Sequence, residues 1–159
     1  IQIYTNNNST AQKFNLVKDN NLTGTQTISN GTYVIGISKA KNQVFDIASG
    51  STKNKANVQL YKSNNSKAQQ FKITYVKDGY YKIINAKSNK SLDIKGASQL
   101  NSANIWQYTY NGSSAQLWKI QKNSDGTYTF ISRCNGKAID AKGGKTTNKT
   151  NIKQYDKNT

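Results

Sequence analysis

The sequence predicts an all-β fold made of three copies of one unit, and two observations carry this prediction. First, two sets of residues recur at intervals of 47 positions: Asp46, Asp93 and Asp140, and Tyr61, Tyr108 and Tyr155. Second, the segments between them alternate apolar and polar residues over short runs, which is typical of half-buried strands. A repeat period of this length indicates a fold more firmly than local propensities do.

Each repeat begins with a turn and a strand, at residues 31–38, 79–85 and 126–132. In the first of these strands, Tyr33 and Ile35 alternate with residues expected on the other face. A polar turn then leads to a short second strand, which carries the repeated aspartate.

A polar loop connects this strand to a third one, with the sequence NVQLY at 57–61 and NIWQY at 104–108. A fourth strand begins with a Gln-x-aromatic element at 69–71 and 116–118. No segment has a helical period. Three repeats of four strands close best into a barrel with a hairpin cap, because closure removes exposed edge strands.

The N-terminus contains the same motif out of step. Residues 1–4 and 12–14 match the third and fourth strands, but they precede the next copy by 57 residues rather than 47. The ten extra residues lie within 19–30, which has the polar composition of a linker. We expect three parts: a closing segment at residues 1–18, a linker at 19–30 and a main unit at 31–159. The main unit consists of three repeats, at 31–78, 79–125 and 126–159, of which the last is incomplete.

The third repeat stops before its own Gln-x-aromatic element, and residues 9–17 have the sequence of that element. A barrel without one strand would expose its core and an unpaired edge. We therefore expect the N-terminal segment to fill the gap, either within one chain as a circular permutation or between chains as a swapped dimer. The alternative is that residues 1–18 are the tail of an upstream copy of the fold.

Composition indicates one polar, basic domain. The chain has 159 residues, of which 34% are hydrophobic, and 23 Lys and Arg against 7 acids give a net charge of +16. Such a charge attracts polyanions, among them nucleic acid, teichoic acids and sulfated or sialylated glycans, although scattered lysines also serve to solubilise a polar domain. No apolar run is long enough to predict membrane insertion. With neither a signal-peptide pattern nor an initiator Met, the chain is interpreted as a mature form or a fragment.

The residue types argue against catalysis. The absence of His excludes Ser-His and Cys-His nucleophiles and imidazole metal sites. Cys134 is the single cysteine, so neither a disulfide nor a thiolate cluster forms, and we expect it to be a small buried hydrophobe. A glycosidase needs two carboxylates within about 5–10 Å, and one aspartate per repeat matches that poorly. We predict no enzyme activity, no metal and no cofactor.

The pattern resembles the ricin-type lectin β-trefoil. The aspartate-bearing strand, the NVQLY motif and the Gln-x-Trp element at 116–118 are similar to this family, in particular to tandem copies in extracellular proteins of Gram-positive bacteria. Phe14 and Phe71 replace the signature Trp in two copies, a swap that a core position tolerates. The resemblance implies a β-trefoil and a secreted, non-catalytic carbohydrate-binding module, associated in some cases with a cell surface, that anchors a larger protein to glycans.

In this family each repeat holds a shallow sugar pocket. An Asp accepts hydrogen bonds from sugar hydroxyls, and an aromatic ring packs on the apolar sugar face. The resemblance implies ligands of the galactose or N-acetylgalactosamine type and one candidate site per repeat. The candidate residues are Asp46, Gln59, Tyr61 and Gln69 in the first repeat, Asp93, Tyr108 and Gln116 in the second, and Asp140 and Tyr155 in the third.

The sequence departs from the family pattern in two respects. Trp106 and Lys153 stand at the position of Gln59 in the second and third repeats. The Asn that often precedes the signature Gln is replaced by alanine at Ala11, Ala68 and Ala115. Loss of that donor weakens the sites or moves the contact to loop residues such as Asn64 and Asn65.

Other interpretations of the same residues stay open. Each aspartate could cap the following loop, and Gln69 and Gln116 could brace the fold rather than touch a ligand. For the whole chain, one alternative is an electrostatic binder of anionic cell-wall polymer or nucleic acid. The other is a structural or interaction module whose sugar pockets have decayed.

Overall fold

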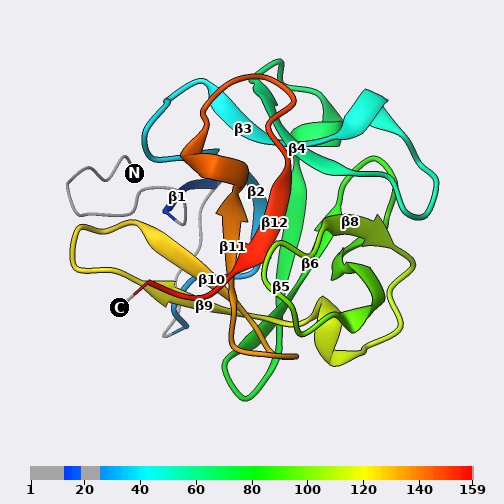
Figure 1. The fold of residues 1–159 in the computed structure, drawn as a ribbon, viewed down its shortest axis with the longest axis vertical. Coiled ribbons are helices and arrows are strands. Elements are labelled where there is room, and N and C mark those ends of the chain that lie inside the picture. Colours follow the sequence, from blue (N-terminus) through cyan, green and yellow to red (C-terminus); the bar gives the residue numbers. More distant parts are fainter. Residues whose placement is uncertain (1–12, 19–25, 159) are drawn as a thin grey trace.

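The computed structural model describes residues 13–18 and 26–158 (Figure 1). Short strands dominate these residues. The strands are β1 (Phe14–Lys18), β2 (Gly31–Ile37), β3 (Gln43–Ile47), β4 (Val58–Lys62), β5 (Phe71–Lys77), β6 (Tyr80–Asn85), β7 (Ser91–Ile94), β8 (Ile105–Tyr108), β9 (Trp118–Lys122), β10 (Tyr128–Ser132), β11 (Ala138–Ala141) and β12 (Ile152–Tyr155). The single-turn 3-10 helices are η2 (Ala48–Gly50), η3 (Lys67–Gln69), η4 (Lys95–Ala97), η5 (Ser114–Gln116) and η6 (Lys142–Gly144).

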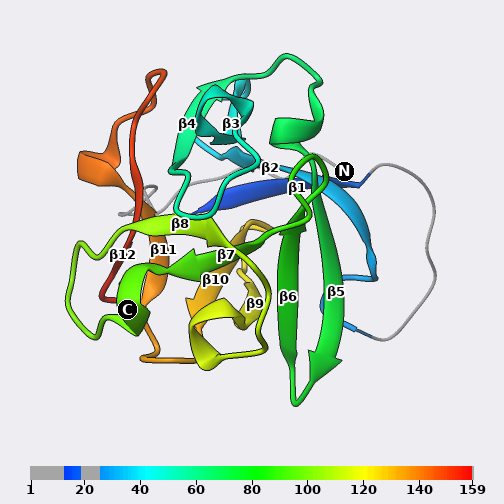
Figure 2. The same ribbon diagram turned by 90° about the vertical axis from the view of Figure 1, so that its right-hand side faces the viewer.

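Six of the strands form a closed antiparallel barrel, in which β1 pairs with β2, β2 with β5, β5 with β6, β6 with β9, β9 with β10, and β10 with β1. The other six form the hairpins β3–β4, β7–β8 and β11–β12, one per repeat. Figure 2 shows β5 and β6 as long neighbouring strands of the barrel. The predicted β-trefoil is confirmed, with four strands in each repeat.

The fourth strand of the third repeat is β1. It pairs with β2 from Phe14 opposite Ile37 to Lys18 opposite Tyr33, and with β10 through Phe14 opposite Tyr128. The strands β5 and β9 make the corresponding two pairings in their own repeats. The gap is thus filled within one chain. Residues 1–12 and 19–25 lie outside the described part, so the boundaries of the closing segment and the linker stay predictions.

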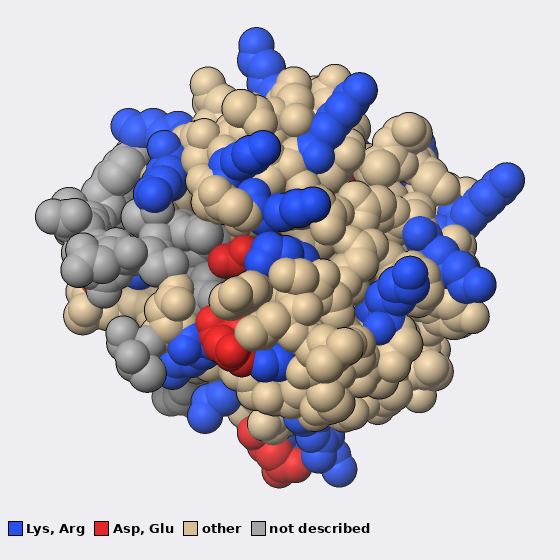
Figure 3. All heavy atoms as spheres, viewed as in Figure 1, with Lys and Arg blue, Asp and Glu red and all other residues tan. Residues whose placement is uncertain are grey.

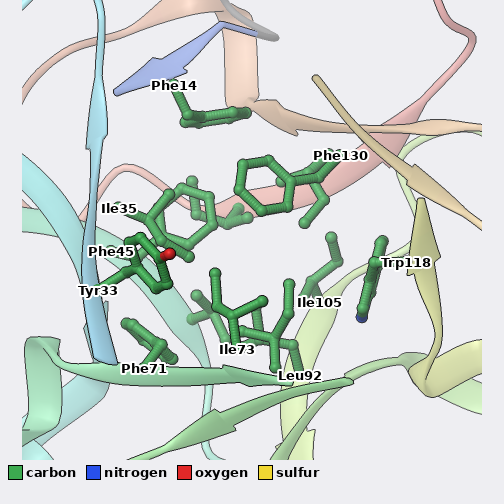
Figure 4. Packing of buried hydrophobic residues seen from close by; sticks show 14 of the residues in the cluster. Phe14, Tyr33, Ile35, Phe45, Phe71, Ile73, Leu92, Ile105, Trp118 and Phe130 are labelled. Carbon is green, nitrogen blue, oxygen red and sulfur yellow. The ribbon is translucent and has the colours of Figure 1, made fainter. Parts of the chain in front are cut away.

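The core fills the barrel with one aromatic anchor from the start of each fourth strand. Phe14, Phe71 and Trp118 have no exposed surface (Figure 4). The Phe14 ring meets Phe45 and Phe130 edge to face, with centroids 4.9 and 5.9 Å apart, a favoured aromatic geometry. The swap of Trp for Phe is accommodated because neighbouring rings fill the space.

A ring of three asparagines ties the hairpins together near the pseudo-threefold axis. Asn57 Nδ2 donates to Asn151 Oδ1 at 2.8 Å, Asn151 Nδ2 to Asn104 Oδ1 at 2.8 Å, and Asn104 Nδ2 to Asn57 Oδ1 at 2.9 Å. Each asparagine immediately precedes the third strand of its repeat. The ring therefore fixes the relative positions of β4, β8 and β12, the strands that carry half of each candidate site.

Two further features complete the fold. Lys13, next to β1, forms a salt bridge of 2.7 Å with Asp125, and both side chains are about nine-tenths buried. Cys134 packs against the core but is only half-buried, which corrects the expectation of a buried residue. It lies at the edge of the core, where its Sγ accepts a hydrogen bond from Gln99 Nε2. No helix in the described residues has the length and apolar character needed to cross a membrane.

Candidate functional sites

The three candidate sites are built alike, because each aspartate lies opposite a residue of the next strand in a hairpin. The facing pairs are Asp46 and Gln59, Asp93 and Trp106, and Asp140 and Lys153. All three aspartates are buried to more than nine-tenths. Each carboxylate thus meets a different donor: an amide, an indole or an ammonium group.

In the first repeat, two amides hold the carboxylate. Gln59 Nε2 donates to Asp46 Oδ1 at 3.0 Å, and Gln69 Nε2 donates to Oδ2 at 3.1 Å. Gln69 in turn accepts a hydrogen bond from the backbone N–H of Asn64 at 2.9 Å and donates to the carbonyl of Lys62 at 3.1 Å. The carboxylate is therefore fixed in orientation, while each oxygen keeps lone-pair capacity to accept from a ligand.

An open pocket of about 650 Å³ lies over this carboxylate. Its lining residues are Asp46, Ala48, Ser49, Gly50, Gln59, Tyr61, Asn64, Ser66, Lys67, Ala68, Lys87 and Lys149. Of the residues predicted for this repeat, Asp46, Gln59 and Tyr61 line the pocket. Gln69 is 1% exposed and supports the carboxylate from beneath.

In the second repeat, an aromatic donor replaces the amide. Trp106 Nε1 donates to Asp93 Oδ1 at 2.5 Å, and the indole stacks on Tyr108 with the ring centroids 6.2 Å apart. Burial raises the pKa of Asp93, and the hydrogen bonds from Trp106 and Gln116 oppose that rise. Gln116 has no exposed surface and also bonds the carbonyl of Thr109 at 3.0 Å. The site combines one carboxylate with two half-exposed rings.

In the third repeat, an ion pair forms. Lys153 Nζ lies 3.2 Å from Asp140 Oδ1 and 4.0 Å from the centroid of the Tyr155 ring, which is 42% exposed. The ammonium group therefore stands between the two residues predicted to hold a sugar. A carboxylate that is already ion-paired is a poorer acceptor for neutral hydroxyls. The Gln-x-aromatic glutamine of this repeat, Gln12, lies outside the described residues.

Some residues at the sites were not among the sequence candidates. Trp106 was noted only as a replacement for Gln59, although the 47-residue period alone places it beside Asp93. Lys87 and Lys149 come from the second and third repeats, and no pattern in the sequence connects them to Asp46. Within residues 13–18 and 26–158, no cluster of His, Cys, Asp and Glu could hold a metal ion.

Comparison with known families gives a match over most of the chain. The model described as "Ricin-type beta-trefoil lectin domain-like" matches residues 10–101 and, in a second overlapping match, residues 67–155. A search of curated proteins gave no match.

Solved structures with similar folds include a designed protein, an enzyme and a lectin. The designed threefold symmetric protein ThreeFoil is 34% identical, with 73% of this chain and 83% of that chain covered and a TM-score of 0.72. An exo-beta-1,3-galactanase from Clostridium thermocellum is 31% identical, with 92% and 27% covered and a TM-score of 0.71. The Macrolepiota procera ricin B-like lectin, solved in complex with lactose, is 20% identical, with 85% and 92% covered and a TM-score of 0.71. The chain thus spans about a quarter of the galactanase.

Proposed function

This chain belongs to the family of ricin-type β-trefoil lectin domains, and from this premise we propose that it is a non-catalytic carbohydrate-binding module. The observation that carries the proposal is the first-repeat pocket, in which two amides orient the Asp46 carboxylate beside the Tyr61 ring. This arrangement matches the two faces of a pyranose, one of which presents hydroxyls while the other presents C–H groups.

The fixed carboxylate is suited to sugar hydroxyls for a physical reason. A charged acceptor makes stronger hydrogen bonds than a neutral one, and Gln59 and Gln69 hold Asp46 in place before a ligand arrives. Because the group is already oriented, little conformational entropy is lost on binding.

The three sites are not expected to bind equally. The second site offers Asp93 together with the stacked rings of Trp106 and Tyr108, which favours sugar stacking. In the third site the Lys153 ammonium occupies the Asp140 carboxylate. We therefore rank the first two sites above the third, and the combined affinity of two sites for a branched glycan exceeds that of either alone.

Ligands of the galactose or N-acetylgalactosamine type, and attachment to a larger secreted protein, belong to the same proposal. Support comes from the galactanase, a longer protein that is 31% identical to this chain over the matched part and of which this chain spans 27%. In a larger secreted protein, two sugar sites would keep the domain attached to this chain close to its glycan.

A second candidate function is electrostatic binding of an anionic polymer, favoured by the net charge of +16. The two functions respond differently to salt, since binding of a polyanion weakens steeply as salt rises and binding of a neutral sugar does not.

The test is calorimetric titration with lactose, N-acetylgalactosamine and an anionic polymer (heparin) at low and high salt. We expect salt-independent binding that is lost in the double variant Asp46→Asn/Asp93→Asn and kept in Asp78→Asn, which alters an exposed turn aspartate. Binding only to anionic polymers, insensitive to the double variant, would favour the electrostatic function. Binding to neither class would indicate a structural module with decayed pockets.

A further inference from the structure

Three lysines from three different repeats surround the first-repeat pocket. Lys67 begins η3, Lys87 lies in the turn after β6, and Lys149 lies in the loop before β12. All three are exposed, and in the part of the chain that the structure describes none of them is ion-paired with a carboxylate. Asp46 is the one acid among the residues that line the pocket.

The backbones that carry these lysines are held in place by buried or paired groups. Asn85, with no exposed surface, donates to the carbonyl of Lys67 at 3.3 Å and accepts from the N–H of Lys87 at 3.1 Å. The N–H of Lys149 donates to the carbonyl of Leu60 at 2.7 Å. The backbone at each lysine is therefore held beside the pocket, and long exposed side chains carry the ammonium groups from there.

Gly50 makes room for one of the ammonium groups. A Cβ at this position would lie 2.7 Å from Lys87 Nζ, so the ammonium group, at the end of a flexible side chain, would have to shift. The Lys87 ammonium group thus lies beside η2 at the edge of the pocket, and its side chain stays exposed. Gly50 also has a φ of +57°, so its replacement by Ala would add backbone strain.

The three positions held by these lysines are more basic around the first-repeat pocket than around the second-repeat site. In the second repeat, the residues that correspond to Lys67, Lys87 and Lys149 are Ser114, Cys134 and Lys55. At these three positions the second-repeat site has one lysine, whereas the first-repeat pocket has three. Figure 3 shows that basic side chains are numerous over the upper part of the molecule, where Figure 1 draws β3, β4 and the connection from β11 to β12.

We propose that the first-repeat pocket binds a sugar that carries an acidic group, a carboxylate or a sulfate ester, with its hydroxyls on Asp46 and its acidic group on the lysines. The inference rests on the proposed carbohydrate-binding function and specifies the ligand of that site. Asp46 and a ligand anion repel each other, so the acidic group is directed to the rim, where three ammonium groups supply charge-assisted hydrogen bonds. A neutral galactoside uses only the Asp46 side of the same pocket.

The test compares lactose, sialyllactose and sulfated lactose by calorimetric titration of the whole chain at about 0.15 M salt. The key variant is Lys67→Ser/Lys87→Ser/Lys149→Ser, which approaches the composition of the second repeat. Its matched control is Lys72→Ser/Lys77→Ser/Lys119→Ser, which removes the same charge from exposed positions of the barrel strands β5 and β9. The two acidic ligands distinguish carboxylate from sulfate recognition.

We expect at least one acidic ligand to bind more tightly than lactose and to lose about tenfold or more of its affinity in the pocket variant. Lactose should lose much less affinity than the acidic ligand in that variant, and the control should retain the preference for the acidic ligand. If lactose binds and the acidic ligands bind no better, the inference fails while the carbohydrate function stands. Equal losses in the two lysine variants would overturn it in favour of long-range attraction. Failure of all three ligands to bind would instead refute the carbohydrate function on which it rests.

Discussion

Trp106 donates its indole N–H to Asp93 at 2.5 Å, in the place where the first repeat uses the amide of Gln59. The indole therefore has two functions, as a donor that orients the carboxylate and as a flat surface beside Tyr108. We predict that Trp106→Phe removes the hydrogen-bond donor to Asp93 and keeps a ring, while Trp106→Gln keeps a donor and removes the ring. Both variants should weaken the second site, with NMR titration of a galactoside as the measurement.

The two variants should differ in the pKa of Asp93. Burial raises this pKa and the indole hydrogen bond opposes the rise, so Trp106→Phe should raise it further and Trp106→Gln should leave it nearly unchanged. The carboxyl carbon shift of Asp93 as a function of pH reports the result. Equal pKa values in the two variants would contradict the assigned role of the indole N–H.

A second prediction concerns stability at the same aspartate. Because the pKa of Asp93 is raised in the folded state, the folded protein prefers the neutral carboxyl, and this group favours unfolding more as pH rises through its folded pKa. Asp93→Asn removes the charge and keeps an acceptor for Trp106. We expect this variant to be at least as stable as the parent at pH 7 and to have lost its second sugar site. A clear fall in melting temperature at neutral pH would refute the expectation.

A third prediction concerns the salt bridge that holds the start of β1. Burial tends to raise the pKa of Asp125, but the hydrogen bonds from Lys13 and Thr127 outweigh this effect and lower it. The stabilisation is therefore present above the unfolded pKa of an Asp and is lost as pH falls through the lowered folded value. Lys13→Met should cost about 1–2 kcal/mol of unfolding free energy at pH 7 and much less at strongly acidic pH.

Urea unfolding at both pH values measures the difference. The control is Lys122→Met, which changes an exposed lysine at the end of β9. Loss of stability that is the same at both pH values would show that Lys13 acts through its packing rather than its charge.

A fourth prediction tests the asparagine ring. Removing one member leaves a donor and an acceptor of its neighbours unpaired in a half-buried site, so Asn104→Ala should destabilise the protein by about 1–3 kcal/mol. Replacement of Asn57, Asn104 and Asn151 together should cost less than three times the single change, because no orphaned partner remains. Urea unfolding of the single, double and triple variants gives the coupling; strict additivity would contradict a cooperative ring.

A fifth prediction follows from the closure of the barrel by β1. Deletion of residues 1–18 removes the fully buried Phe14 and opens the barrel between β2 and β10, each of which loses its pairing with β1. We expect the shortened chain to lose its cooperative thermal transition in circular dichroism, since a core side chain and a strand are both missing. A shortened chain that melts like the parent would show that β1 is dispensable.

The periodic part of the sequence predicted most of the fold. The 47-residue spacing of Asp46, Asp93 and Asp140 places them on equivalent strands, and the structure has the three hairpins there. The missing Gln-x-aromatic element of the third repeat predicted that an N-terminal strand would close the barrel. Both are consequences of symmetry, which a single sequence displays directly.

The features that break the symmetry were harder to predict. The ion pair between Asp140 and Lys153 depends on the identity of one residue at a repeated position. The sequence shows that Lys153 is charged, but it does not show that the ammonium group contacts Asp140. The lysines around the first-repeat pocket were harder still to predict from the sequence, because Lys87 and Lys149 reach that pocket from other repeats. Packing between repeats brings them together, and no local pattern encodes it.

The closure of the barrel by β1 also has a consequence for the order of folding. Lys13 and Asp125 meet although 112 positions separate them in the chain. During synthesis on a ribosome, β1 is made before β10 and cannot pair with it until β10 has emerged. Until then, Phe14 stays exposed to solvent. Contacts of such sequence separation slow folding through the entropy of loop closure. Barrel closure is therefore expected to come last, after the two internal repeats have formed their hairpins.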